Sequence, residues 1–158
     1  MKTKLTIVLM ICFFANFMTA QTMVKTAVFT MAKAATILKN KGYTIVEQTD
    51  AYVKIKNKEN SVLFIDIDDH KKYLYLNTNI LLEKSASKEK IDSLIAEIND
   101  LNMIKVKYSE KQNSVLFQYF YWITDSFTEE SFADAVLEFF LFYGDSYGLD
   151  KEKIFDYE

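Results

Sequence analysis

The stretch Asn113–Trp122, NSVLFQYFYW, predicts the strand around which the chain is built. After Asn113, every residue except Ser114 and Gln118 is aliphatic or aromatic. Side chains of these types fit a pleated surface, and an unbroken apolar run is typical of a strand that is buried in a sheet. We therefore expect a central strand here.

The same pattern occurs earlier in the chain. Residues 53–64, VKIKNKENSVLF, match residues 106–117, VKYSEKQNSVLF, at eight of twelve positions. Each copy reads as two short strands around a polar turn, so we expect two β-hairpins with similar turns. An internal duplication and convergent turn chemistry explain the repeat equally well.

The first twenty residues have the three-part layout of a secretory signal peptide. Lys2 and Lys4 precede an apolar run from Leu5 to Met18, and Thr19-Ala20 ends the segment. We expect cleavage after Ala20. Residues 21–158 would then form a single α+β domain that is periplasmic or secreted.

Two other interpretations of this segment are weaker. A retained membrane anchor would need an apolar run of about twenty residues, and the run here is clearly shorter. Cys12 could mark a lipoprotein, but Ile11 stands where a small residue would be expected. We therefore expect no stable membrane insertion of the mature chain.

Charge argues against nucleic acid as a partner. All 19 basic residues are lysines, and loss of Lys2 and Lys4 changes the net charge from −3 to −5. Phosphate binding requires clustered basic residues, and arginine supplies the bidentate contact that lysine cannot make. The single cysteine, Cys12, leaves with the signal peptide, so the mature domain depends on its core and not on disulfides.

Apolar periodicity predicts an α+β fold with three helices and an antiparallel sheet of five or six strands, in the order α-β-β-β(-β)-α-β-β-α. The expected helices are Val24–Lys41 with Gly42 as its cap, Ser87–Leu101, and a third that starts at Ser126 or Thr128 and ends at Gly144 or Gly148. The expected strands are Tyr43–Thr49, Ala51–Lys56, Ser61–Asp68, Tyr73–Leu82, Met103–Tyr108 and Ser114–Trp122. The tail Leu149–Glu158 is expected to dock through Ile154 and Phe155.

The chain resembles the YbjN family and, more distantly, the class I type III secretion chaperones over residues 24–147. The matching features are the element order and four local patterns: Lys41-Gly42-Tyr43-Thr44, the strand Ser61–Asp68, the helix Ile91–Leu101 with its Asn99-Asp100-Leu101-Asn102 ending, and Thr128-Glu129-Glu130. The resemblance implies a protein-binding or regulatory module, often dimeric, with no active site to carry over. Secretion chaperones are cytoplasmic, so the signal peptide argues against that particular role.

Catalytic and metal sites are not favoured. Asp66, Asp68, Asp69 and His70 superficially resemble a calcium loop, but Lys71 and Asn77 occupy the positions where an EF-hand needs glycine and glutamate. We therefore expect a solvated turn. His70 is the only histidine, and no glycine-rich phosphate loop is present, so no catalytic residue, cofactor or metal is predicted.

One face of the predicted sheet carries many aromatic residues. If Leu63, Ile65 and Leu74 face the helices, the opposite face presents a candidate interface for a protein partner or a second copy. Its residues are Phe64, Tyr73, Tyr75, Phe117, Tyr119 and Tyr121. Two alternatives remain open: a helix covers this face, or the last strand has the reverse pleat, so that Leu116, Phe120 and Trp122 lie there.

The sequence thus favours a non-enzymatic, chaperone-like binding module of the bacterial envelope that dimerises or holds a protein through this face or the edge of the second helix. The second hypothesis is a carrier or enzyme with a pocket for a small apolar ligand between sheet and helices, lined by Phe139, Phe140 and Tyr143. Hydrolytic or redox catalysis ranks third.

Overall fold

Strand β7 (Ser114–Trp122) pairs with β5 (Tyr73–Leu81) along its whole length and lies inside the sheet, as the apolar run predicts. This computed structural model describes residues 21–101 and 103–156. The expected signal peptide therefore lies outside the described residues. All neighbouring strands of the six-stranded sheet are antiparallel, in the order β2-β3-β4-β5-β7-β6.

The remaining strands and the helices follow the expected order, so the predicted α+β class is confirmed. The other strands of this sheet are β2 (Thr44–Gln48), β3 (Tyr52–Lys56), β4 (Val62–Ile67) and β6 (Lys105–Ser109). The α-helices are α2 (Met31–Asn40), α3 (Lys88–Asn99) and α4 (Glu129–Leu149).

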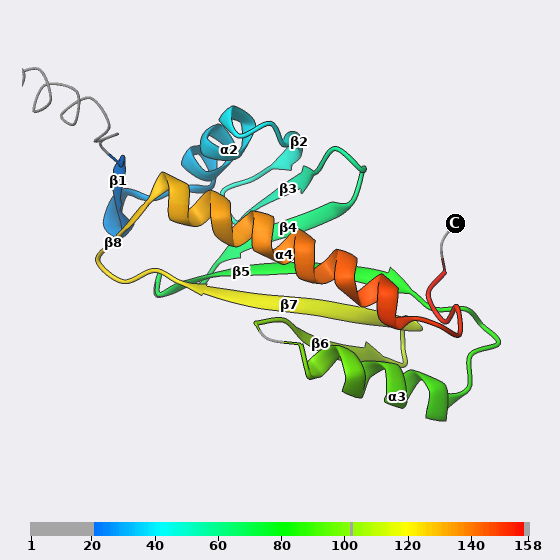
Figure 1. Ribbon diagram of the computed structural model, residues 1–158. Coiled ribbons are helices and arrows are strands. Elements are labelled where there is room, and N and C mark those ends of the chain that lie inside the picture. The colour runs from blue at the N-terminus through cyan, green and yellow to red at the C-terminus, as the bar shows by residue number, and fades with distance from the viewer. Residues whose placement is uncertain (1–20, 102, 157–158) are drawn as a thin grey trace, which may run out of the picture.

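The core lies between one face of the sheet and the helices, and α4 runs obliquely across that face (Figure 1). Alternate residues of β3, β4, β5 and β7 face this core, because successive side chains of a strand alternate between its faces. The buried strand residues include Val53, Ile55, Leu63, Ile65, Leu74, Leu76, Val106, Val115 and Phe117. The helices contribute apolar stripes from α2, α3 and α4, with Phe132, Val136 and Phe139 of α4 fully buried.

The predicted first helix starts too early. Residues Met23–Lys25 form strand β1, which pairs with β8 (Ser126–Thr128), and a single 3-10 turn, η1 (Thr26–Val28), follows. The α-helix begins only after Thr30, whose hydroxyl accepts a hydrogen bond from the Lys33 backbone N–H. An N-cap residue has extended backbone, so Thr30 separates the two segments.

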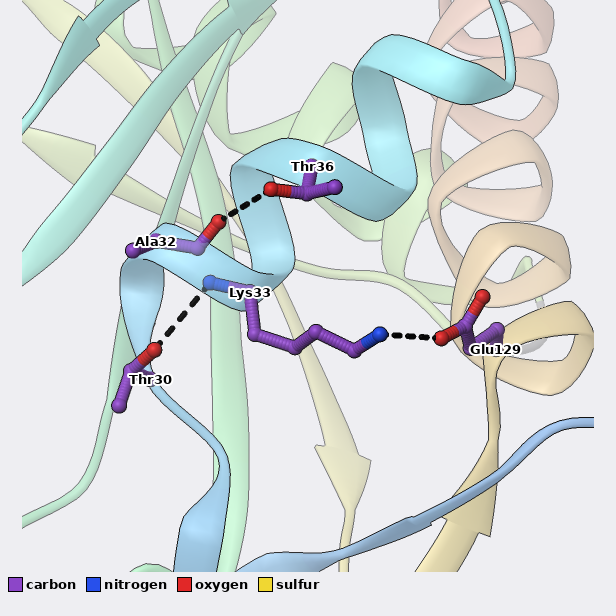
Figure 2. Close-up of polar contacts among 5 residues, drawn as sticks. All are labelled: Thr30, Ala32, Lys33, Thr36 and Glu129. Atoms are coloured by element: carbon purple, nitrogen blue, oxygen red, sulfur yellow. Dashed lines mark hydrogen bonds and ion pairs between the residues drawn. The ribbon is translucent and has the colours of Figure 1, made fainter.

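Helices α2 and α4 are joined near their N-terminal ends. The Lys33 ammonium lies 2.5 Å from a Glu129 carboxylate oxygen, and Figure 2 shows this contact bridging the two helices. In the same helix, the Thr36 hydroxyl donates to the Ala32 carbonyl oxygen. Glu129 opens α4, where a carboxylate also interacts favourably with the helix dipole.

Helix α4 starts after Thr128, one of its two predicted starts, but it ends later than predicted. Thr128 is the N-cap, and Ser131 completes a capping box with it. The helix passes through Gly144 and Gly148 to Leu149, so neither glycine terminates it. Burial of its apolar side against the sheet outweighs the low helix propensity of two glycines. At the end of α2, by contrast, Gly42 has a positive φ of 92° and caps the helix as expected.

The C-terminal tail docks as predicted, through buried Ile154 and Phe155. The buried Asp150 carboxylate accepts hydrogen bonds from the backbone N–H groups of Ile154 (2.7 Å) and Phe155 (2.8 Å). Phe155 then forms an isolated bridge with Leu82, just after β5. One carboxylate thus shapes the turn that returns the chain to the core.

The two repeated hairpins differ in register by one residue. In β3–β4, Lys56 pairs with Val62, and Asn57 and Ser61 bond to each other across three loop residues. In β6–β7, Ser109 pairs with Ser114 across a loop of four residues. A shift of one residue exchanges the two faces of a strand.

The repeated NSVLF strings consequently point in opposite directions. Leu63 is buried in the core and Phe64 lies on the outer face, whereas the equivalent Leu116 lies outside and Phe117 is buried. Identical residues therefore have different environments, and similarity of the two strings does not extend to their packing.

This difference gives a stability test within the repeat. Phe117→Ala should lower the free energy of unfolding by about 3–5 kcal/mol, because it removes a fully buried ring and leaves a cavity. Phe64→Ala should cost less, about 1–2 kcal/mol, because that ring is only partly buried and leaves no enclosed cavity. Urea unfolding of both variants measures the two values, and equal losses would contradict the assigned pleat.

The tail gives a second test. Asp150→Ala should lower the free energy of unfolding by about 1–3 kcal/mol, because two backbone N–H groups lose their acceptor in a buried position. It should also make residues 151–156 cleavable in limited proteolysis. Asp145→Ala, an exposed carboxylate of the same helix, serves as the control. An unchanged tail in Asp150→Ala would show that Ile154 and Phe155 hold it without the carboxylate.

Candidate functional site: the open aromatic face

The outer face of the six-stranded sheet, called the open face below, carries none of the helices formed by residues 21–101 and 103–156 (Figure 1). The register places one row of residues across four strands: Tyr52, Asp66, Tyr75 and Phe120. Tyr73 and Trp122 pair beside this row. All these side chains share one face because directly paired residues in an antiparallel sheet point the same way.

The aromatic rings on the open face contact one another across the strands. Tyr75 stacks on Phe120 with ring centroids 5.1 Å apart, and Tyr73 meets Phe120 edge-on at 5.4 Å and Trp122 at 5.5 Å. Trp122 is 67% exposed and Phe120 43% exposed. The strands thus present a continuous apolar surface to solvent, of a kind that marks binding sites when polar groups surround it.

Half of the candidate interface predicted from the sequence lies elsewhere. Phe64, Tyr73 and Tyr75 are on the open face, but Phe117, Tyr119 and Tyr121 point toward the helices. The structure has the reverse pleat, the alternative in which Leu116, Phe120 and Trp122 lie on the open face. The cause is the longer loop of the second hairpin, which the repeat in sequence conceals.

The three inward aromatics are partnered within the chain. Phe117 packs edge-on against Tyr143 of α4, with centroids 5.2 Å apart. The Tyr121 hydroxyl lies 2.7 Å from the Ser131 hydroxyl, so it connects β7 to the start of α4. Tyr119 is half-buried against the core, and burial is the main cause that raises the pKa of its phenol.

Polar side chains lie beside the outer aromatics. The Asn77 amide donates to the Asp66 carboxylate at 2.8 Å, and the Gln118 amide donates to the Tyr75 hydroxyl. Burial raises the pKa of Asp66, and the Asn77 hydrogen bond only partly opposes that effect. Burial also raises the pKa of Tyr75. The sheet thus already removes water from one carboxylate at the centre of the open face.

Basic groups lie toward both edges of the same face. The Lys54 ammonium on β3 lies 5.1 Å from the centroid of the Phe64 ring, a cation–π geometry. Lys105 and Lys107 are exposed on β6, at the opposite edge. A hollow of about 300 Å³ lies between these edges and includes Asp66, Tyr75 and Phe120 in its lining. The open face therefore combines apolar area with both signs of charge.

The acidic turn after β4 uses its carboxylate internally. Asp68 accepts hydrogen bonds from the backbone N–H groups of His70, Lys72 and Tyr73. Burial alone would raise the pKa of Asp68, but these three donors outweigh it and lower the pKa. Within residues 21–101 and 103–156, no group of three His, Cys, Asp or Glu side chains is arranged to hold a metal ion.

A second surface feature lies on the helix side of the sheet. Only two of the three residues predicted to line a ligand pocket do line one. Phe140 and Tyr143 line a groove of about 600 Å³, whereas Phe139 is buried in the core. The groove lies between the end of α2, the β3–β4 turn and the middle of α4. Sequence reasoning missed its exposed rim residues Leu137 and Leu141, although the apolar residues of α4 were too numerous for a single stripe.

The described part of the chain contains no helix that is long and apolar enough to cross a membrane.

A scan against protein-family models finds no match, and a search of curated proteins finds none either. A search of solved structures finds YbjN from E. coli, a proposed transcription regulator, with a TM-score of 0.66 and 13% sequence identity. The alignment covers 79% of this chain and 94% of YbjN. The chain therefore has a YbjN-like fold, as the sequence resemblance implied.

Proposed function

We propose that this protein is a non-enzymatic binding module whose open aromatic face associates with a second copy of the chain. The observation that carries the proposal is the exposed cluster of Tyr73, Tyr75, Phe120 and Trp122, which no helix of the described chain covers. Aromatic residues with polar tips are enriched at interfaces because they combine large apolar area with hydrogen-bonding groups.

Charge on the open face supports a second copy as the occupant. A two-fold symmetric contact brings the same surface together twice, so the surface must complement itself. Here Glu47 and Lys54 lie at one edge of the face and Lys105 and Lys107 at the other, while Asp66 lies near the middle. Such a mixed surface can be rotated onto a copy of itself without placing only like charges opposite one another.

The proposed location is the periplasm or the exterior of the cell. This location depends on the expected signal peptide at residues 1–20. The acidic net charge of the mature chain favours a protein partner over nucleic acid. The YbjN-like fold is compatible with a protein-binding module. A role specific to type III secretion is not part of the proposal.

The first test is the mass of residues 21–158 in solution. Light scattering coupled to size-exclusion chromatography should show a dimer for the unaltered domain and a folded monomer for Phe120→Lys, because the substitution removes a ring of the apolar cluster and places a charge where a second copy would exclude water. Val46→Lys provides a matched control, since Val46 is 45% exposed, close to the 43% of Phe120, but lies on edge strand β2.

Three results would oppose this assignment. A monomeric domain would remove the second copy as occupant, and a heterologous partner would then be the remaining use of the face. A dimer that Val46→Lys disrupts would place the contact on the β2 edge. A dimer that neither substitution affects would place it elsewhere on the molecule.

The association should also depend on pH through Asp66. Burial already raises its pKa, and a second copy over the face would remove more water and raise the pKa further. Protonation therefore favours the dimer, so the association constant should rise as the pH falls from 7 to about 4, about tenfold for each further pKa unit per copy. Sedimentation equilibrium measures the association constant at each pH. Asp66→Asn should remove most of its pH dependence, and Asp69→Asn, in the exposed turn, should leave the pH dependence unchanged. An association constant that rises with pH would contradict the proposed burial of Asp66 in the dimer contact.

A further inference from the structure

The groove on the helix side differs in character from the open face. Its volume of about 600 Å³ lies in the range of small-molecule sites, about 300–1,000 Å³. Phe140 and Tyr143 form its floor, and Leu137 (48% exposed) and Leu141 (52% exposed) line it from α4. Tyr43 closes one side by stacking on Phe140, with ring centroids 5.8 Å apart.

Two ammonium groups lie beside this apolar floor. Lys41 at the end of α2 and Lys58 in the β3–β4 turn both line the groove. Neither has an ion-pair partner among residues 21–101 and 103–156, although Lys33, Lys88 and Lys90 do. Glu59 is the one acidic side chain of the lining, which leaves the rim with a net positive charge.

The remaining polar groups of the lining are neutral. The Tyr143 and Tyr147 hydroxyls lie 2.8 Å apart and bond to each other. Burial, followed by the charge of Glu59, raises the pKa of Tyr43, so this phenol stays protonated at physiological pH and can donate a hydrogen bond. The groove thus offers an apolar floor, two cations and a phenol donor, but no buried carboxylate.

We propose that this groove binds a single-chain amphiphile with an anionic head group, such as a medium-chain fatty acid. The alkyl chain lies along Leu137, Phe140 and Leu141, where it is removed from water. The carboxylate lies at the rim, between the ammonium groups of Lys41 and Lys58, which supply charge-assisted hydrogen bonds. This ligand site is separate from the open face and does not depend on dimerisation.

Gly144 provides a way to block the groove without damaging the fold. It lines the groove, lies inside helix α4, and a Cβ added to it would meet no atom within 4 Å. Gly144→Leu should therefore fold with an unchanged or higher melting temperature, because leucine favours helices more than glycine does, while its side chain fills the groove. Gly148→Leu is the matched control, since Gly148 has the same free space in the same helix but lies outside the groove lining.

Isothermal titration calorimetry with monomeric decanoate tests the site on residues 21–158. Decanoate should bind the unaltered domain and Gly148→Leu equally, and Gly144→Leu should weaken binding by about tenfold or more. The double substitution Lys41→Gln and Lys58→Gln should weaken decanoate binding about tenfold but leave decanol binding unchanged, because only the head group loses contacts. Lys39→Gln, outside the lining, should have no effect.

Several outcomes would overturn the proposal. No heat of binding with decanoate would remove the site. Equal binding of decanoate and decyltrimethylammonium would contradict the role of the two lysines. Binding that Gly144→Leu leaves intact but Phe120→Lys abolishes would move the ligand to the open face, and would leave the dimer of the proposed function to be judged by its own mass measurement.

Discussion

In the hairpin β6–β7, Ser109 pairs with Ser114 across four loop residues, and this register fixes the direction of every side chain of β7. Because β7 is bonded to β5 along its whole length, the same register decides which aromatics meet α4 and which meet solvent. A hairpin with the shorter loop of β3–β4 would turn Phe117 outward and Trp122 inward. The core and the open face therefore depend on one loop residue.

The two sides of β7 explain the unusual composition of the strand. Its inner residues Phe117 and Tyr121 pack against α4 and the aromatic cluster around Phe127 and Phe132, which supports a 21-residue helix that contains two glycines. On its outer side, the rings of Phe120 and Trp122 contact those of Tyr73 and Tyr75. A sheet face exposed to water does not require such residues, and this is why the proposed interface is placed on the open face.

Sequence patterns were sufficient for the order of the three α-helices and the six strands of the main sheet, but not for the small β1–β8 sheet. Ser87 and Thr128 cap their helices as expected because capping is a local interaction, and Gly42 adopts the positive φ that its position requires. The errors came from contacts that are distant in sequence. Val24 fits a helical stripe, but it pairs with Phe127, about a hundred residues later, and no local pattern of residues 24–41 reveals that partner.

The repeat caused the second error, because similar residues suggested similar faces. The groove could not be predicted for a related reason: it lies between the end of α2, the β3–β4 turn and α4, and these segments are distant in sequence. The β3–β4 hairpin consequently contributes to both surfaces, with Phe64 on the open face and Lys58 at the groove. A ligand that orders this turn would act on a strand of the open face as well, so the two surfaces are separate in chemistry but share one structural element.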